Sequence, residues 1–168
     1  MENADYIKLN EILLEQEKLL RFDHFTNRDA WELGCFLVDK IYKSDFYLSV
    51  AIRKVNGAIL FQHLPGSTNL NNQNWMMRKF RTVALMERSS LGVWAQSYLS
   101  EEPVAKHGLC ETEYVFCGGG FPICLKNGEV VAVLTVSNLP HHKDHKFIVN
   151  ALCEWLKIDV PKTDSFDF

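Results

Sequence analysis

Apolar side chains recur at the spacing of an α-helix in five stretches of the chain. The periodicity predicts helices over residues 5–20, 27–42, 72–88 and 91–99, and a final helix that follows Pro140 and runs to about residue 156. Asn27 is expected to cap the second helix, because its short side chain can accept a hydrogen bond from the first turn. The second helix has a wider apolar face than the first and is expected to be the more buried of the two.

Two hairpins are predicted between the helices. Residues 46–54 alternate in polarity and are rich in aromatic and β-branched types, and residues 58–62 return as the partner strand. Asn56-Gly57 between them favours a type I′ turn, which needs a positive φ at both central positions. Residues 121–125 and 130–137 form the second hairpin, and the nearly continuous apolar run of 130–137 predicts a central strand covered on both faces.

The order of elements is helix, helix, hairpin, helices, hairpin, helix. Two hairpins without long parallel crossovers predict an antiparallel sheet with helices packed on it, which is an α+β fold. The 168 residues suit a single domain, which we place at residues 1–158. The polar stretch 159–168 is expected to be a frayed C-terminal tail.

Composition excludes several classes of protein. An apolar content of 47% and a net charge of −3 are ordinary for a folded domain, which argues against intrinsic disorder. A pI of about 6.1 provides no broad positive field for nucleic acid. The chain shows no stretch as long as a membrane span, and its acidic N-terminus lacks the features of a secretory signal. We therefore expect a cytoplasmic protein without membrane or nucleic-acid partners.

The cysteines indicate a reducing compartment. There are five, an odd number, and they include no C-x-x-C pair. Three lie among apolar neighbours and are expected to be buried: Cys35, Cys124 and Cys153. Cys117, beside a run of glycines, is the thiol expected to be accessible. A Cys–His nucleophile would require His63 or His107 to lie close to it, and burial as a spectator is the alternative.

A basic cluster lies just beyond Trp75 and after a polar loop. It consists of Arg78, Lys79 and Arg81. Guanidinium groups pair with carboxylates in a bidentate manner, so a basic cluster beside an aromatic ring suits a planar ligand that carries carboxylates. The alternative is a solvated helix face paired with nearby acids.

A glycine run, Gly118-Gly119-Gly120, leads directly into the strand that starts at Phe121. Because glycine has no side chain, its backbone can approach a flat or anionic ligand closely. The run precedes a strand rather than a helix, so it is not a dinucleotide-binding fingerprint. A tight bend at a crowded strand entry is the alternative interpretation.

The sequence HHKDH at residues 141–145 is the densest group of potential metal ligands. His141 and His145 have the i, i+4 spacing that can place two imidazoles on one helix face. However, a single segment contributes and the sequence has no second cluster of matching spacing, so we expect no metal site. An exposed first helical turn in which Asp144 complements the helix dipole is the favoured interpretation.

Four segments of the chain stand out by their order and spacing. They are AWELG (30–34), LPGSTNLNNQNWMMRKFRTV (64–83), GGGFPI (118–123) and VSNLPHHKDHKFIV (136–149). Together they resemble the haem-degrading-domain family, also called GlcG/HbpS-like, and especially its small cytosolic branch. The resemblance extends over about residues 11–156.

The resemblance implies a profilin-like layered sandwich, with a five-stranded antiparallel sheet and helices on its faces. It also implies a homo-oligomer. Some members of the family bind haem and others have no assigned activity, so the resemblance constrains fold more than function. The small branch usually has His at the position of Cys117 and Gly at that of Asn138, whereas Asp144 and His145 match its motif.

The favoured hypothesis is a protein that binds a small anionic ligand, with haem or another tetrapyrrole as the candidate cofactor. The expected ligand-binding residues are Trp75, Arg78, Lys79, Arg81, Cys117, Gly118, Gly119, Phe121, Asp144 and His145. The alternative is a non-enzymatic interaction protein that acts as an oligomeric scaffold or chaperone-like partner. A third hypothesis, an enzyme that degrades haem or uses a cysteine nucleophile, needs a catalytic constellation, and we assign no catalytic residue.

Overall fold

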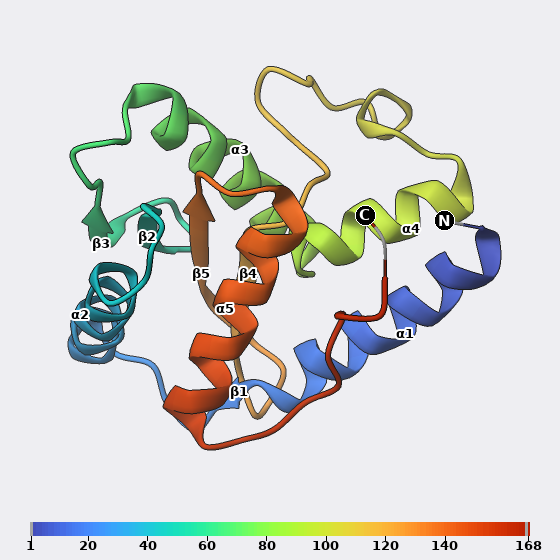
Figure 1. Cartoon of the computed structure of the whole chain (residues 1–168). Helices are drawn as coiled ribbons and strands as arrows, with labels where there is room; N and C mark the ends of the chain where they lie inside the picture. Colours follow the sequence, from blue (N-terminus) through green and yellow to red (C-terminus); the bar gives the residue numbers. More distant parts are fainter. Residues whose placement is uncertain (1, 167) are drawn as a thin grey trace.

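A five-stranded mixed sheet forms the centre of the computed structural model, which describes residues 2–166 and 168 (Figure 1). Its strand order is β1-β4-β5-β2-β3. The strands are β1 (Arg21–Phe22), β2 (Ser49–Lys54), β3 (Ile59–His63), β4 (Gly120–Leu125) and β5 (Val130–Ser137). The α+β class is confirmed.

The two predicted hairpins, β2–β3 and β4–β5, are present, and β5 of one pairs with β2 of the other. β2 pairs antiparallel with β3. The turn between them is not of the predicted type I′, because Gly57 has a φ of +93° but Asn56 does not have a positive φ, and the Gly57 amide donates to the Lys54 carbonyl at 2.8 Å. β5 lies between β4 and β2 and pairs antiparallel with both. Six consecutive residues of β5, from Ala132 to Ser137, are buried, so the prediction of a central strand covered on both faces is confirmed.

The prediction of a purely antiparallel sheet is wrong. β1 pairs parallel with β4, with Arg21 opposite Cys124 and Phe22 opposite Leu125. A two-residue strand is too short to show an alternating pattern, so it gives no periodic signal. The long connection between β1 and β4 also removes the constraint that makes hairpin neighbours antiparallel.

Five α-helices and one short 3₁₀ helix accompany the sheet in the described part of the chain. They are α1 (Asn3–Leu19), α2 (Asn27–Tyr42), α3 (Leu70–Met86), α4 (Ser90–Ser100), the 3₁₀ helix Val104–His107 and α5 (His141–Leu156). Thr26, not Asn27, caps α2. The Thr26 hydroxyl accepts from the Asp29 amide at 3.2 Å, and the Asp29 carboxylate accepts from the Thr26 amide at 2.6 Å, so the two residues form a capping box.

The helices cover both faces of the sheet (Figure 1). α2 and α5 pack on one face, where Leu134 and Val136 of β5 contribute to the largest apolar core. α3 packs on the opposite face, where Phe80 contacts Val133. α1 packs against α4 through a smaller cluster that includes Leu13. Alternate side chains of β5 therefore contribute to two different apolar cores, one on each face of the sheet.

Residues near the C-terminus contact the helical layer. Val160 and Thr163 are buried, and the Gln16 side-chain amide donates to the Pro161 carbonyl at 2.7 Å. A frayed tail over 159–168 and a domain boundary at residue 158 remain predictions. None of the described helices has the length and apolar character needed to cross a membrane.

The cysteines are distributed differently from the expectation. Cys124 is buried and Cys153 is half-buried, whereas Cys35 is exposed. The reason is that the neighbouring residue, Gly34, is the one that faces the sheet, so close to the Phe61 ring that a β-carbon would lie 2.3 Å from it. Cys35 consequently points away from the core.

Candidate functional site

A hollow of about 530 Å³ brings together four of the predicted ligand-binding residues: Trp75, Lys79, Cys117 and Asp144. It lies where the first turns of α3 and α5 meet the end of β5 and the segment before β4. We call this hollow the Trp75 pocket. Its volume is in the range of about 300–1,000 Å³ that is typical of small-ligand sites.

A buried ion pair forms the inner wall of the Trp75 pocket. Lys79 Nζ lies 2.7 Å from Asp144 Oδ2, and the two side chains are only 3% and 1% exposed. Lys79 Nζ also donates to the Val136 carbonyl at 2.9 Å, and Asp144 Oδ1 accepts from the Leu139 amide at 3.1 Å. Asp144 is therefore not on an exposed first turn. The expectation of an exposed first turn is wrong, because the start of α5 packs against α3. Lys79 is fully used in contacts with Asp144 and the Val136 carbonyl.

Burial raises the pKa of Asp144 to about 6, although the nearby Lys79 ammonium and the hydrogen bonds to the carboxylate act in the opposite direction. At neutral pH the carboxylate is still ionised and paired. The inner wall thus presents an ion pair with no net charge rather than a free cation.

Cys117 lies in the wall of the Trp75 pocket and is half-buried. Burial raises the pKa of its thiol, against a smaller lowering by Lys79. His63 contacts the Tyr42 hydroxyl at 3.2 Å, and the His107 ring packs on Phe116. Within the described residues, neither histidine is hydrogen-bonded to Cys117, so the geometry does not provide an activated nucleophile there.

His141 is the histidine that lines the Trp75 pocket, and sequence reasoning did not single it out as a ligand-binding residue. Its Nδ1 accepts from the Gly118 amide at 3.3 Å, and its ring packs on Trp94 with centroids 4.9 Å apart. Burial lowers its pKa to about 4, with smaller contributions from His142 and Lys79. His141 is therefore a neutral imidazole at pH 7, and because Nδ1 accepts from the amide, the ring proton is on Nε2, which can donate a hydrogen bond.

Six of the predicted residues do not line the Trp75 pocket, and two of these, His145 and Phe121, are buried in the interior. His145 is fully buried, and its Nε2 lies 2.9 Å from the side-chain oxygen of Gln16 on α1. Phe121 is fully buried in the largest core. His141 and His145 are one helical turn apart, but His141 lines the Trp75 pocket and His145 is buried against α1.

The basic cluster does not act as a unit. Arg78 stacks over the Trp75 ring at 4.5 Å and donates to the Glu111 carbonyl at 2.6 Å. Arg81 lies 3.5 Å from the Glu113 carbonyl. Successive helical residues project about 100° apart, so Lys79 points inward while the two arginines hold the loop that passes α3.

The glycine run fits its packing interpretation. A β-carbon on Gly118 would lie 2.2 Å from the His141 carbonyl oxygen, and one on Gly119 would lie 2.5 Å from Lys79 Nζ. Gly119 also has a φ of +109°, which disfavours any other residue. The glycines thus let the strand entry pass beside α5 and the buried lysine.

The family model described as "Haem degrading protein HbpS-like" matches residues 25–153 of the chain. The chain belongs to the HbpS-like family. A UPF0303 protein of Paraburkholderia phymatum is 38% identical over 148 residues, which are 88% of this chain and 89% of that protein.

Solved structures agree with membership of the HbpS-like family. The crystal structure of the Ybr137w protein superposes with a TM-score of 0.81 and 27% identity, and covers 88% of this chain and 87% of that one. The structure named PduOC:Heme complex has a TM-score of 0.59 and 16% identity, and covers 82% and 96% of the two chains. At that identity it shows the shared fold alone.

Asn138 lines the Trp75 pocket and has a φ of +143°, in the region that favours glycine. Its side-chain amide donates to the Tyr47 carbonyl at 2.9 Å, and its side-chain oxygen lies 3.2 Å from Asn72 Nδ2. The two contacts hold a conformation that glycine would adopt without strain.

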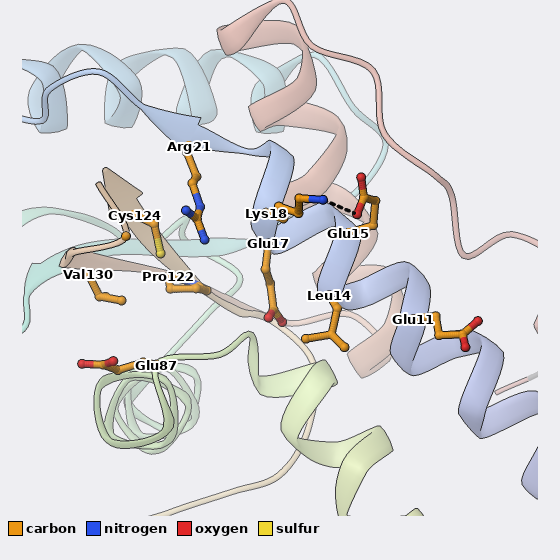
Figure 2. A pocket seen from close by; sticks show the side chains of 11 residues that line it. Glu11, Leu14, Glu15, Glu17, Lys18, Arg21, Glu87, Pro122, Cys124 and Val130 are labelled. Atoms are coloured by element: carbon orange, nitrogen blue, oxygen red, sulfur yellow. Dashed lines mark ion pairs between the residues drawn. The ribbon is translucent and has the colours of Figure 1, made fainter. Parts of the chain in front are cut away.

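A second hollow, of about 480 Å³, lies between α1 and β4 and contains none of the predicted site residues (Figure 2). Arg21 extends into it beside Cys124, with Glu17 on the opposite side. The Glu17 carboxylate accepts a hydrogen bond from the Ser89 hydroxyl at 2.6 Å and forms an ion pair with Arg88. This hollow has mixed charges and no feature that connects it to the Trp75 pocket.

Proposed function

We propose that the chain binds haem or another tetrapyrrole in the Trp75 pocket. The observation that carries the proposal is the lining of the hollow by the rings of Trp75, Trp94 and His141, the last a neutral imidazole whose Nε2–H can donate to a bound ligand. The name of the HbpS-like family and the haem in the PduOC complex support the same ligand class.

The residues present fit a haem group in three respects. The Nε2–H of His141 can donate a hydrogen bond to a haem carboxylate, because Nδ1 accepts from the Gly118 amide and the ring proton is therefore on Nε2. Trp75 and Trp94 supply flat apolar surface for the macrocycle. Arg78 does not line the hollow, but its guanidinium lies over the Trp75 ring, and we expect it to meet a ligand carboxylate from there. Haem, when bound, would supply a redox-active iron centre.

Titration of the purified protein with hemin tests the proposal. The natural chain should give a saturable Soret shift, and His141→Ala should weaken binding about fivefold, because the Nε2–H donor is lost. Arg78→Ala should weaken binding about fivefold, since one charge-assisted contact is lost, whereas Arg81→Ala should have little effect.

The matched control is His24→Ala, which removes an exposed histidine paired with Asp29 at the start of α2. A featureless spectrum for the natural chain would contradict the proposal. Equal losses in the His24 and His141 variants would also contradict it, because they would indicate nonspecific hemin adsorption.

A further inference from the structure

A groove of about 860 Å³ runs between α2 and α5 on the outer side of the helical layer. We call it the α2–α5 groove. At one end the Phe36 ring packs on Trp155, with centroids 5.3 Å apart, and Lys40 pairs with Glu154. At the other end the Phe46 ring meets Phe147 edge-on at 5.9 Å.

The floor of the α2–α5 groove is apolar. Phe36, Phe46, Phe147 and Leu139 line it, and all four remain partly accessible while their inner surfaces pack on the largest core. The stretch of α5 that borders the groove, from Lys143 to Glu154, is about 16 Å long at 1.5 Å per residue. A floor of this kind suits an extended hydrocarbon chain.

The rim of the α2–α5 groove is positive. Four lysines and two acids line it, and three of the lysines have acidic partners: Lys40 with Glu154, Lys43 with Asp39 and Lys146 with Asp164. Lys143 has no acidic partner within 4 Å among the described residues. It stands at the end where Phe46 and Leu139 lie, so one free ammonium marks one end of an apolar floor.

We propose that the α2–α5 groove binds an amphiphile with an anionic head, a fatty-acid carboxylate, whose chain lies on the phenylalanine floor and whose carboxylate meets Lys143. The volume is that of a small-ligand site, which favours a single acyl chain over a protein segment. The proposal is independent of tetrapyrrole binding, although Leu139 borders both hollows.

Calorimetric titration with dodecanoate, below its micelle-forming concentration, tests this site on the natural chain. Saturable binding of one molecule per chain is expected. Lys143→Glu should weaken it about fivefold, since an exposed ion pair is replaced by a repulsion. The matched control Lys8→Glu reverses an exposed lysine on α1 and should leave the affinity unchanged. Phe46→Ala should weaken binding about tenfold, with its melting temperature measured in parallel to verify folding.

Several results would overturn the proposal. These are the absence of dodecanoate binding, equal affinity for dodecanol, or equal losses in the Lys143 and Lys8 variants. Dissociation of a dimer into monomers on addition of dodecanoate would also overturn it, because a second copy of the chain would then be the natural occupant of the α2–α5 groove. His141→Ala should leave dodecanoate binding intact, so failure of the tetrapyrrole proposal would be distinguishable.

Discussion

Lys79 and Asp144 connect α3 to α5 through one ion pair shielded from water. Removal of one partner leaves a buried charge without compensation, which typically costs about 3–5 kcal/mol. Replacement of both partners by apolar residues of similar volume is often neutral, because the cost of burying two charges is removed as well.

We therefore predict that Lys79→Met lowers the free energy of unfolding by about 3 kcal/mol and that Lys79→Met/Asp144→Leu restores most of it. Urea denaturation of the two variants and the natural chain measures the difference. If the double variant is no more stable than Lys79→Met, this expectation is wrong.

Two buried histidines predict loss of stability in acid. Burial lowers the pKa of His145 to about 3 and that of His141 to about 4, from an ordinary 6.5. The unfolded chain thus binds protons first as the pH falls below about 6.5, and stability decreases toward pH 4. Asp144 opposes this, because its raised pKa makes the folded chain bind a proton first below about pH 6.

His145→Gln should reduce the loss of unfolding free energy between about pH 6.5 and pH 4 by about 3 kcal/mol, at 1.36 kcal/mol per pH unit. Denaturation curves at several pH values measure the slope. The exposed His24→Gln serves as the control and should keep the slope of the natural chain. Equal slopes in all three proteins would contradict the assignment of the acid sensitivity to His145.

At the scale of elements, the glycine run determines how closely β4 approaches α5. Gly118→Ala would place a methyl group 2.2 Å from the His141 carbonyl, so the start of α5 must shift. We predict a loss of about 1–3 kcal/mol in unfolding free energy and weaker hemin binding, because His141 moves with the helix.

Gly66→Ala provides the control, since a β-carbon there has nothing within 4 Å. Its stability should equal or slightly exceed that of the natural chain, because alanine reduces the entropy of the unfolded state. A normal melting temperature for Gly118→Ala would show that the strand entry is less crowded than the geometry indicates.

Local signals account for the elements that could be predicted. The Asn56-Gly57 turn and the helical periodicity act within a few residues, so the hairpins and helices could be identified. β1 could not be identified, because a two-residue strand is too short to show an alternating pattern of apolar and polar residues. The Trp75 pocket was predicted in part: Trp75 and Lys79 are adjacent on α3, but His141 joins them only through packing between distant segments.

The burial of Lys79 could not be anticipated either. Lysines are almost never fully buried unless they are paired, and the partner, Asp144, is 65 residues away. The signal that could have indicated it was the motif carried by the resemblance, in which Asp144 is a matching position. Nothing in residue spacing alone joins the two.

At the scale of the whole molecule, one edge of the sheet is open. β3 is an edge strand, and its outer backbone groups pair with no other strand of the described chain. Beside it lie large exposed apolar side chains, with Trp31 59% and Ile59 54% accessible. Monomeric proteins usually protect such an edge with charge, proline or a covering element.

We predict that the protein self-associates through this edge and that Trp31→Glu/Ile59→Lys reduces the association constant by at least about tenfold. Sedimentation velocity at micromolar concentration measures the oligomer. Leu85→Glu, which alters an exposed residue on α3, is the control and should keep the oligomer intact. A natural chain that sediments as a monomer would exclude this arrangement.

The parallel pairing of β1 with β4 has a consequence for how the chain is made. β2 and β3 are separated by a few residues and can pair soon after both are synthesised. Arg21, by contrast, cannot pair until its partner Cys124 has been synthesised about a hundred residues later. At translation rates of about 5–20 residues per second, roughly 5–20 s separate their appearance. During that interval the first strand has no neighbour, and Gln16 lacks its contact with His145. The beginning of the chain is therefore among the last parts to reach its final structure.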